Sequence, residues 1–349
     1  MSARICRCHH VLQGIGKSPG GKPEHLPMAS GVFSIVVPVF ILIALGYGLA
    51  RFKVLGPSVG EALGQYVYVV AIPVLIFRTL AVVNLDGETP YTLWASYFTG
   101  VAAAWTLGTL VIRRGFGREA RAGVIGGISA AFANTIMVGL PLVSELYGGD
   151  GLVPILLIIS VHLPIMTVVT AILMERAVAL DGLGEAVRPA VLLRRIARNL
   201  VTNPIVIGIV CSLVWRSTGL PIEGVLQDVL DKIAATALPV ALFSLGMSMV
   251  AYGMRGNVLP GLILSLIKMI VMPAVVFAAG AFVFQLPPLW TAVATLTAAC
   301  PTGVNAYIFA NRYGTGHAMS TNAITVTTAA AVVTTGLWAI WLDIWTASP

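Results

Sequence analysis

Residues 131–141 read AFANTIMVGLP, and this stretch decides the fold. It lies inside an apolar run long enough to cross a membrane, yet it contains an amide, a hydroxyl, a glycine and a proline. Proline removes a backbone N–H and its ring clashes with the preceding turn, and glycine loosens the same turn. The stretch therefore predicts a membrane helix that is broken here. Backbone groups freed at membrane depth must be buried by protein or line a polar cavity, so the break marks a candidate binding site.

A second stretch of the same kind, ACPTGVNA, occupies residues 299–306. Two broken membrane segments at corresponding positions of two halves are a sequence indication of a transporter's binding site. The candidate substrate-binding residues of the two stretches are Asn134, Thr135, Gly139, Pro141, Pro301, Thr302, Gly303 and Asn305.

The composition is that of a membrane protein. The 349 residues are 58% hydrophobic and 10% charged, whereas soluble domains carry roughly 25% charged residues. The net charge of +7 does not indicate nucleic-acid binding, because the basic residues gather in loops between apolar runs. Two cysteines lie in the N-terminal segment and two in apolar runs, so no disulfide framework is indicated. We expect an all-α polytopic membrane protein.

Residues 1–30 differ from the rest, because they are polar and rich in glycine, proline and basic residues. The cluster CRCHH at residues 6–10 has the side chains of a metal site, but the composition favours a disordered tail, and no metal or cofactor is predicted. Met28, just before the first apolar run, is a candidate translation start. The tail lacks the apolar centre and cleavage site of a secretory signal.

The apolar runs predict ten transmembrane helices, since each needs about 20 apolar residues. Arginine and lysine gather in the loops after odd-numbered runs, whereas the loops after even-numbered runs contain only Arg216. The positive-inside rule then predicts a protein of the cytoplasmic membrane with both termini outside. The expected spans are 32–51, 60–83, 91–112, 121–147, 152–175, 200–217, 227–251, 257–284, 288–313 and 317–342.

The two halves of the chain match at an offset of about 166 residues. Residues 71–77, AIPVLIF, align with residues 237–243, ALPVALF, and the two broken stretches align with one residue more. Five spans per half is an odd number, so the second half crosses the membrane in the opposite sense and the repeat is inverted. We predict repeats at 31–175 and 200–343, joined by a basic cytoplasmic linker at 176–199.

The broken helices suggest a binding chemistry. A helix N-terminus carries about half a positive charge and unpaired N–H donors, so two converging N-termini make an anion site without a cationic side chain. Asn134, Thr135, Thr302 and Asn305 add side-chain donors and acceptors. The alternative is that the two asparagines only cap the half-helices, although capping and ligand contact can coexist. The expected ligand is a small carboxylate-bearing anion.

Two further residues inside apolar runs are candidates for a proton or charge relay. Lys268 lies near the middle of its run, where a charge is costly, so one reading is that it faces protein, water or substrate. The other reading is structural: the side chain snorkels toward the membrane surface or bonds a carbonyl. His162 precedes Pro164 and can relay protons, or it is a buried neutral histidine bonded to a carbonyl. The chain contains no phosphate loop, no His-Glu-x-x-His helix and no Gly-x-Ser-x-Gly elbow, so no enzyme is predicted.

The chain resembles the auxin efflux carrier family. Residues 134–143, NTIMVGLPLV, and 301–313, PTGVNAYIFANRY, are similar to the motifs of its fourth and ninth helices. Residues 37–38, 46–48 and 71–77 also fit its first two helices, and the resemblance extends over about residues 30–343.

The resemblance implies ten spans in a 5+5 inverted repeat with broken crossover helices 4 and 9. Spans 1, 2, 6 and 7 would form a scaffold that dimerises, and spans 3–5 and 8–10 a transport domain that moves as an elevator. Plant members export auxin, and bacterial members are linked to malonate and malate. By resemblance, Asn134 and Pro301 line the substrate site. Plant carriers have proline at the positions of Ala133 and Ala306 and often a long central loop, so these departures favour a bacterial type of carboxylate carrier.

The expected function is secondary active transport of small organic anions, either mono- or dicarboxylates, with membrane lipid as the surrounding partner and no nucleic acid. The driving gradient of protons, sodium or potential stays open at this stage. The alternatives are a channel-like anion pore, a sodium-coupled organic-anion symporter of related fold and, with least support, a membrane-embedded enzyme.

Overall fold

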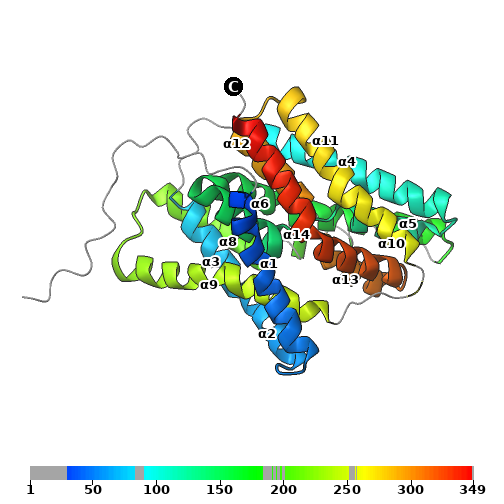
Figure 1. The fold of residues 1–349 in the computed structure, drawn as a ribbon, viewed down its shortest axis with the longest axis horizontal. Coiled ribbons are helices and arrows are strands. Elements are labelled where there is room, and N and C mark those ends of the chain that lie inside the picture. Colours follow the sequence, from blue (N-terminus) through cyan, green and yellow to red (C-terminus); the bar gives the residue numbers. More distant parts are fainter. Residues whose placement is uncertain are drawn as a thin grey trace, which may run out of the picture.

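The structure, a computed structural model, describes residues 30–82, 90–183, 201–250 and 258–347, with the single residues 191, 194, 197, 198 and 256. The predicted tail, with the 6–10 cluster and Met28, lies outside these residues, as does most of the predicted linker after Leu183. Every named element in the described part is a helix (Figure 1).

The helices of the first half are interrupted by short π-helical turns, which are labelled η. They are α1 (Ser30–Arg51), α2 (Pro57–Tyr66), η1 (Val67–Ala71), α3 (Ile72–Leu80), α4 (Pro90–Leu110), η2 (Val111–Gly115), α5 (Ala120–Ala131), η3 (Thr135–Gly139) and α6 (Leu140–Leu180). The helices of the second half are α8 (Pro204–Thr218), α9 (Gly224–Met249), α10 (Leu259–Leu266), η4 (Ile267–Val271), α11 (Met272–Ala278), η5 (Ala279–Val283), α12 (Pro288–Ala299), α13 (Asn305–Tyr313) and α14 (His317–Ala347).

Proline and glycine set several of these boundaries. The first turns of α2, α8 and α12 contain Pro57, Pro204 and Pro288, respectively. A backbone N–H in a first turn makes no hydrogen bond within the helix, so proline, which lacks the N–H, is tolerated there. Gly219 and Gly314 end α8 and α13 in the left-handed conformation, which costs glycine no steric penalty. Helix starts and ends in these places therefore follow directly from the sequence.

α6 contains a sharp bend at Gly148, where two helical segments meet. A straight helix of its 41 residues would be about 60 Å long, twice the thickness of a hydrocarbon core. Gly148 has φ 57° and ψ −145°, a conformation open to glycine but strained for other residues. The residues before Gly148 therefore continue from the first broken stretch, and the helix changes direction at Gly148. The division of this region into the spans 121–147 and 152–175 stays a prediction.

Six helices of the described part are long and apolar enough to cross a membrane, and the chain is an all-helical, multi-pass membrane protein. These six are Pro57–Leu80, Pro90–Gly115, Thr135–Leu180, Gly224–Met249, Leu259–Val283 and His317–Ala347. Shorter apolar helices are Val36–Arg51, Pro204–Thr218 and Pro288–Ala299. The division into ten spans and the 5+5 inverted repeat stay predictions.

The helices pack in two groups, visible in Figure 1. In the first helix group, α1 and α2 pack against α9, and α3 packs against α8 and α9. In the second helix group, α4 packs against α5 and α11, α12 against α11 and α14, and α14 also against α10 and α13. α6 contacts members of both groups. The two interrupted segments thus approach each other within the second helix group.

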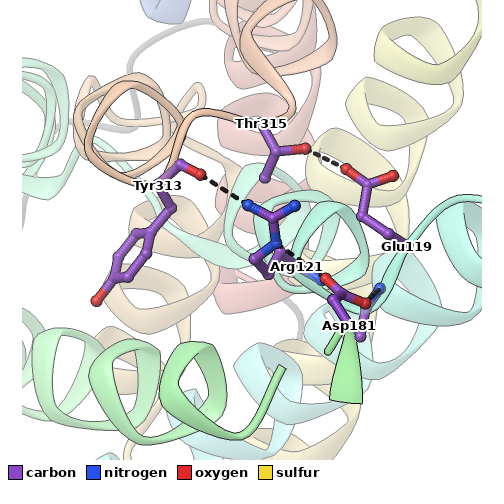
Figure 2. A network of polar contacts seen from close by, with 6 residues as sticks. Glu119, Arg121, Asp181, Tyr313 and Thr315 are labelled. Carbon is purple, nitrogen blue, oxygen red and sulfur yellow. Dashed lines mark hydrogen bonds and ion pairs between the residues drawn. The ribbon is translucent and has the colours of Figure 1, made fainter. Parts of the chain in front are cut away.

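A polar network at one end of the second helix group joins three helix ends (Figure 2). Asp181, just after α6, accepts hydrogen bonds from the backbone N–H groups of Ala120 and Arg121, at 2.8 and 3.1 Å, and so caps the start of α5. Arg121 pairs with Asp181 at 2.9 Å and also donates to the carbonyl of Tyr313, the last residue of α13. The network therefore links the start of α5 to the end of α13. The opposite ends of these two helices lie at the interruptions.

We expect Asp181→Asn to lower the free energy of unfolding by about 1–3 kcal/mol, because the Arg121 contacts lose their charged acceptor. Burial alone would raise the pKa of Asp181, but hydrogen bonds from the Arg121 and Ala120 backbone and the Arg121 side chain outweigh it and lower the pKa. Its stabilising contribution is then present above the usual pKa of 3.8 and is lost as the pH falls through the lowered value. The melting temperatures of the native protein and Asp181→Asn, measured in detergent, should become equal as the pH is lowered into the acid range. A difference in melting temperature that does not change with pH would contradict this prediction.

Candidate functional site

Both predicted breaks are present as interruptions of helix, and their backbones pair with each other. α5 ends at Ala131 and η3 begins at Thr135, while α12 ends at Ala299 and α13 begins at Asn305. The N–H of Asn134 donates to the carbonyl of Pro301 at 2.8 Å, and the N–H of Gly303 donates to Phe132 at 2.8 Å. This short antiparallel bridge satisfies backbone groups that each interruption would otherwise leave unpaired.

Thr302 stabilises this bridge rather than lining a cavity. It is 1% exposed, its hydroxyl donates to the carbonyl of Ser129 at 2.8 Å, and its N–H donates to the hydroxyl of Thr327 at 3.0 Å. These contacts connect the second interruption to α5 and α14. The Thr302 hydroxyl predicted for the substrate site is thus engaged with protein in this structure.

A cavity of about 410 Å³ lies beside the bridge and is lined by both interruptions. Its polar lining residues are Tyr68, Asn134, Thr135, His162 and Asn305. The remainder of its wall is glycine and apolar residues, namely Phe132, Ala133, Ile136, Met137, Leu163, Gly303, Val304 and Ile308. None of these lining residues is Lys, Arg, Asp or Glu, so a ligand's charge would meet dipoles rather than charged side chains.

Asn134 combines the two roles considered for it. Its Oδ1 accepts a hydrogen bond from the N–H of Met137 at 3.2 Å, which caps η3. Its Nδ2 is buried and has no hydrogen-bond partner among the described residues. Because buried polar groups are nearly always paired, this amide leaves donors free for a group that the protein itself does not supply.

Two helix N-termini form part of the cavity wall. η3 begins at Thr135 and α13 begins at Asn305, and both residues line the cavity. Val304, which precedes α13, provides no side-chain cap. Some donors here are already used, since Ala306 and Tyr307 donate to the carbonyls of Gly303 and Val304, and Met137 donates to Asn134. What both helix starts present to the cavity is the positive end of the helix dipole. The arrangement can therefore stabilise an anion without a cationic side chain.

Lys268 makes a hydrogen bond to the end of a neighbouring helix. It is fully buried, and its Nζ donates to the carbonyl of Ala298 at 2.5 Å, in the last turn of α12. Of the roles weighed from the sequence, the bond to a carbonyl is the one present, and Lys268 does not line the cavity. The Nζ donor satisfies a carbonyl near the end of α12, where carbonyls lack helical partners. A relay role for Lys268 stays a prediction.

His162 lies on the cavity wall and is 1% exposed. Its ring makes edge contacts with Phe132, at a centroid distance of 4.8 Å, and Tyr97, at 5.6 Å. It lies near the carbonyl of Ala133, yet neither ring nitrogen makes a hydrogen bond of normal geometry within the described residues. The carbonyl bond weighed from the sequence is thus present only as a loose contact with Ala133, and the relay role stays a prediction.

The cavity wall differs in part from the predicted set. Asn134, Thr135, Gly303 and Asn305 line the cavity, whereas Gly139, Pro141, Pro301 and Thr302 do not. Sequence reasoning missed Tyr68, whose hydroxyl accepts from Asn203 at 3.0 Å. No motif marks Tyr68, and the hydrogen bond spans 135 positions of sequence. In the part of the chain that the structure describes, no three His, Cys, Asp or Glu side chains gather as metal ligands.

The chain is similar over most of its length to known transporters. It is 26% identical over 324 residues to the "Putative malonate transporter" of Rhizobium meliloti, covering 88% of this chain and 94% of that protein. It is 24% identical over 315 residues to an "Uncharacterized transporter" of Methanothermobacter thermautotrophicus, covering 89% and 99%. It is 23% identical over 333 residues to "Auxin efflux carrier component 8" of Arabidopsis thaliana, covering 81% and 89%.

The family described as membrane transport protein matches residues 32–339, which include both helix interruptions and every residue of the cavity wall. The auxin efflux carrier resemblance seen in residues 134–143 and 301–313 is confirmed by these relatives. The chain belongs to the membrane transport protein family, together with the auxin efflux carriers.

Proposed function

We propose that the chain is a secondary active transporter that carries small organic anions, mono- or dicarboxylates, across the cytoplasmic membrane. The observation that carries this proposal is the unpartnered Nδ2 of Asn134 in a cavity formed by two helix N-termini. A carboxylate offers only acceptors, so it complements amide and backbone donors. The names of the relatives from Rhizobium meliloti and Arabidopsis thaliana support the same ligand class.

In our proposal, the second helix group moves as an elevator against the first. The helices within each group pack closely against one another, which supports this division. The two groups correspond to the scaffold and the transport domain that the family resemblance implies. Tyr68 of η1 lines the same cavity as residues of both interruptions, so relative motion of the two groups would change the shape of the site. We further propose that the first helix group forms the homodimer contact and that both termini face outside.

Purified protein should melt at a higher temperature when carboxylates are added, because a ligand that binds only the native state stabilises it. At a concentration 100 times the dissociation constant, the gain is about 2.7 kcal/mol. The panel would contain malonate, lactate and isobutyrate as sodium salts, with sodium chloride at equal ionic strength as the control. Equal melting temperatures with chloride and with every carboxylate would contradict the proposed ligand class.

Electrical recording separates a carrier from a channel-like anion pore. A carrier must change conformation in each cycle, so we expect carboxylate flux in vesicles without resolved unitary currents. Repeating the flux with and without sodium, and at fixed pH or fixed potential, separates a sodium-coupled symporter from proton- or potential-driven transport. The cavity wall supplies no carboxylate side chain for a cation, which favours coupling away from this cavity or to potential alone.

A further inference from the structure

Three buried polar side chains near the first interruption lack hydrogen-bond partners among the described residues. They are Asn134 through its Nδ2, His162 through both ring nitrogens and Tyr97 through its hydroxyl. Leaving a buried polar group without a hydrogen bond is unfavourable, so such groups are candidates for ligand contacts. Two of the three, Asn134 and His162, line the cavity, whereas Tyr97 does not. The anion-transport proposal uses Asn134 but leaves His162 without a role.

The surroundings of His162 hold its ring in place but do not satisfy it. Phe132 and Tyr97 contact the ring at interplanar angles of 79° and 75°, so its position is set by aromatic packing. A neutral imidazole has one N–H donor and one acceptor nitrogen. A rigid side chain with this capacity on a cavity wall is suited to hydrogen-bond a ligand without first being reorganised.

We propose that His162 is the second polar anchor of the anion site and determines its specificity. The Asn134 amide and the helix N-termini hold one carboxylate, and His162 hydrogen-bonds a second polar group of the same molecule. The preferred ligands are then short carboxylates that carry a hydroxyl or a further carboxyl. This inference rests on the proposed transport of organic anions and adds which anions the cavity selects.

The apolar part of the wall sharpens this expectation. A site that hydrogen-bonds a ligand hydroxyl strongly rejects an analogue that lacks it, because the protein group is then left buried and unpaired. Lactate and isobutyrate differ by a hydroxyl in place of a methyl group and are close in size. We therefore expect the native protein to bind lactate at least about tenfold more tightly than isobutyrate, the equivalent of one net hydrogen bond to a buried group.

The test compares His162→Phe with Tyr97→Phe. Phenylalanine keeps an aromatic ring at either position and removes the unpartnered polar atoms. Both variants should melt at or above the temperature of the native protein without ligand, because each removes a buried unsatisfied group. Only His162→Phe should lose the preference for lactate, bringing the two dissociation constants to within about threefold of each other. Titration calorimetry with lactate and isobutyrate measures the ratio directly.

Two further variants complete the experiment. His162→Gln keeps a donor and an acceptor, so it should retain part of the lactate preference. His162→Met, a flexible apolar replacement, serves the same test as His162→Phe if the aromatic variant does not purify. An unchanged lactate preference in His162→Phe or His162→Met, or an equal loss in Tyr97→Phe, would overturn the role of His162.

The outcomes also separate this inference from the transport proposal. If the native protein binds lactate and isobutyrate equally, His162 sets no specificity, and the anion site still stands. If the native protein binds no carboxylate in calorimetry and shows no carboxylate flux in vesicles, the proposed function itself fails, and the inference fails with it.

Discussion

Replacing Asn134 with alanine is expected to reduce carboxylate transport in vesicles by about 10- to 100-fold, because a hydrogen bond to a charged ligand is worth about 1.5–3 kcal/mol. The variant loses the unpartnered Nδ2 and also the cap that Oδ1 provides to the Met137 N–H. Loss of the cap alone should lower stability by about 1 kcal/mol. Transport with radiolabelled malonate and lactate, normalised to protein inserted in the vesicles, measures the effect.

Asn134→Asp separates the two roles of this residue. Aspartate is as good a cap as asparagine, so the variant keeps the hydrogen bond from the Met137 N–H. It replaces the free donors by a carboxylate oxygen buried without a partner, which lowers stability and repels an anionic ligand. We therefore expect both variants to lose transport, the aspartate variant with the cap still in place. Native transport in Asn134→Asp would show that the amide donors do not contact substrate.

Replacing Gly46 with alanine is expected to destabilise the first helix group strongly. A Cβ at Gly46 would lie 2.1 Å from the carbonyl oxygen of Phe243, and one at Gly246 would lie 2.0 Å from that of Ile43. The two glycines thus let α1 and α9 approach at backbone distance, as small residues do between membrane helices. Because backbone cannot rotate away like a side chain, the cost should reach or exceed the 1–3 kcal/mol typical of overpacking.

Gly48→Ala is the matched control, since it lies in the same helix with nothing within 4 Å of its added Cβ. Alanine there should be neutral or should stabilise the helix by up to about 1 kcal/mol through its higher helix propensity. Melting temperatures of the purified variants in detergent provide the comparison. A similar loss in both variants would mean that the α1–α9 approach is not what requires glycine at position 46.

The interruptions were predictable because their cause is local. At the second interruption Pro301 and Gly303 disfavour a regular helix, and the apolar run around them indicates a membrane segment. The first interruption, residues 132–134, precedes Gly139 and Pro141, which lie within η3 and the first turn of α6. The same local chemistry identified Asn134 as both a cap and a candidate contact. It could not separate Asn134 from Thr302, since both are polar residues at a break, and only packing buries the Thr302 hydroxyl against Ser129.

Local sequence patterns could not predict which residues far apart in the chain contact each other. Arg78 pairs with Asp231 at 2.6 Å, across 153 positions of sequence. For Lys268 the sequence offered a carbonyl bond among several alternatives but did not identify the acceptor, because the bond to Ala298 depends on how η4 lies against α12. Neither contact has a signature within either segment, because each is created when separate helices pack.

The sequence by itself determined the membrane class, the positions of the two helix interruptions and the family, since hydropathy, proline and glycine act over a few residues. The tertiary structure alone decided which polar groups face the cavity. Asn134 and His162 come to the same wall only because α6 bends back at Gly148 and packs beside the bridged interruptions. Whether a polar group is left unpaired is a property of its neighbours in space, and one segment of sequence does not contain them.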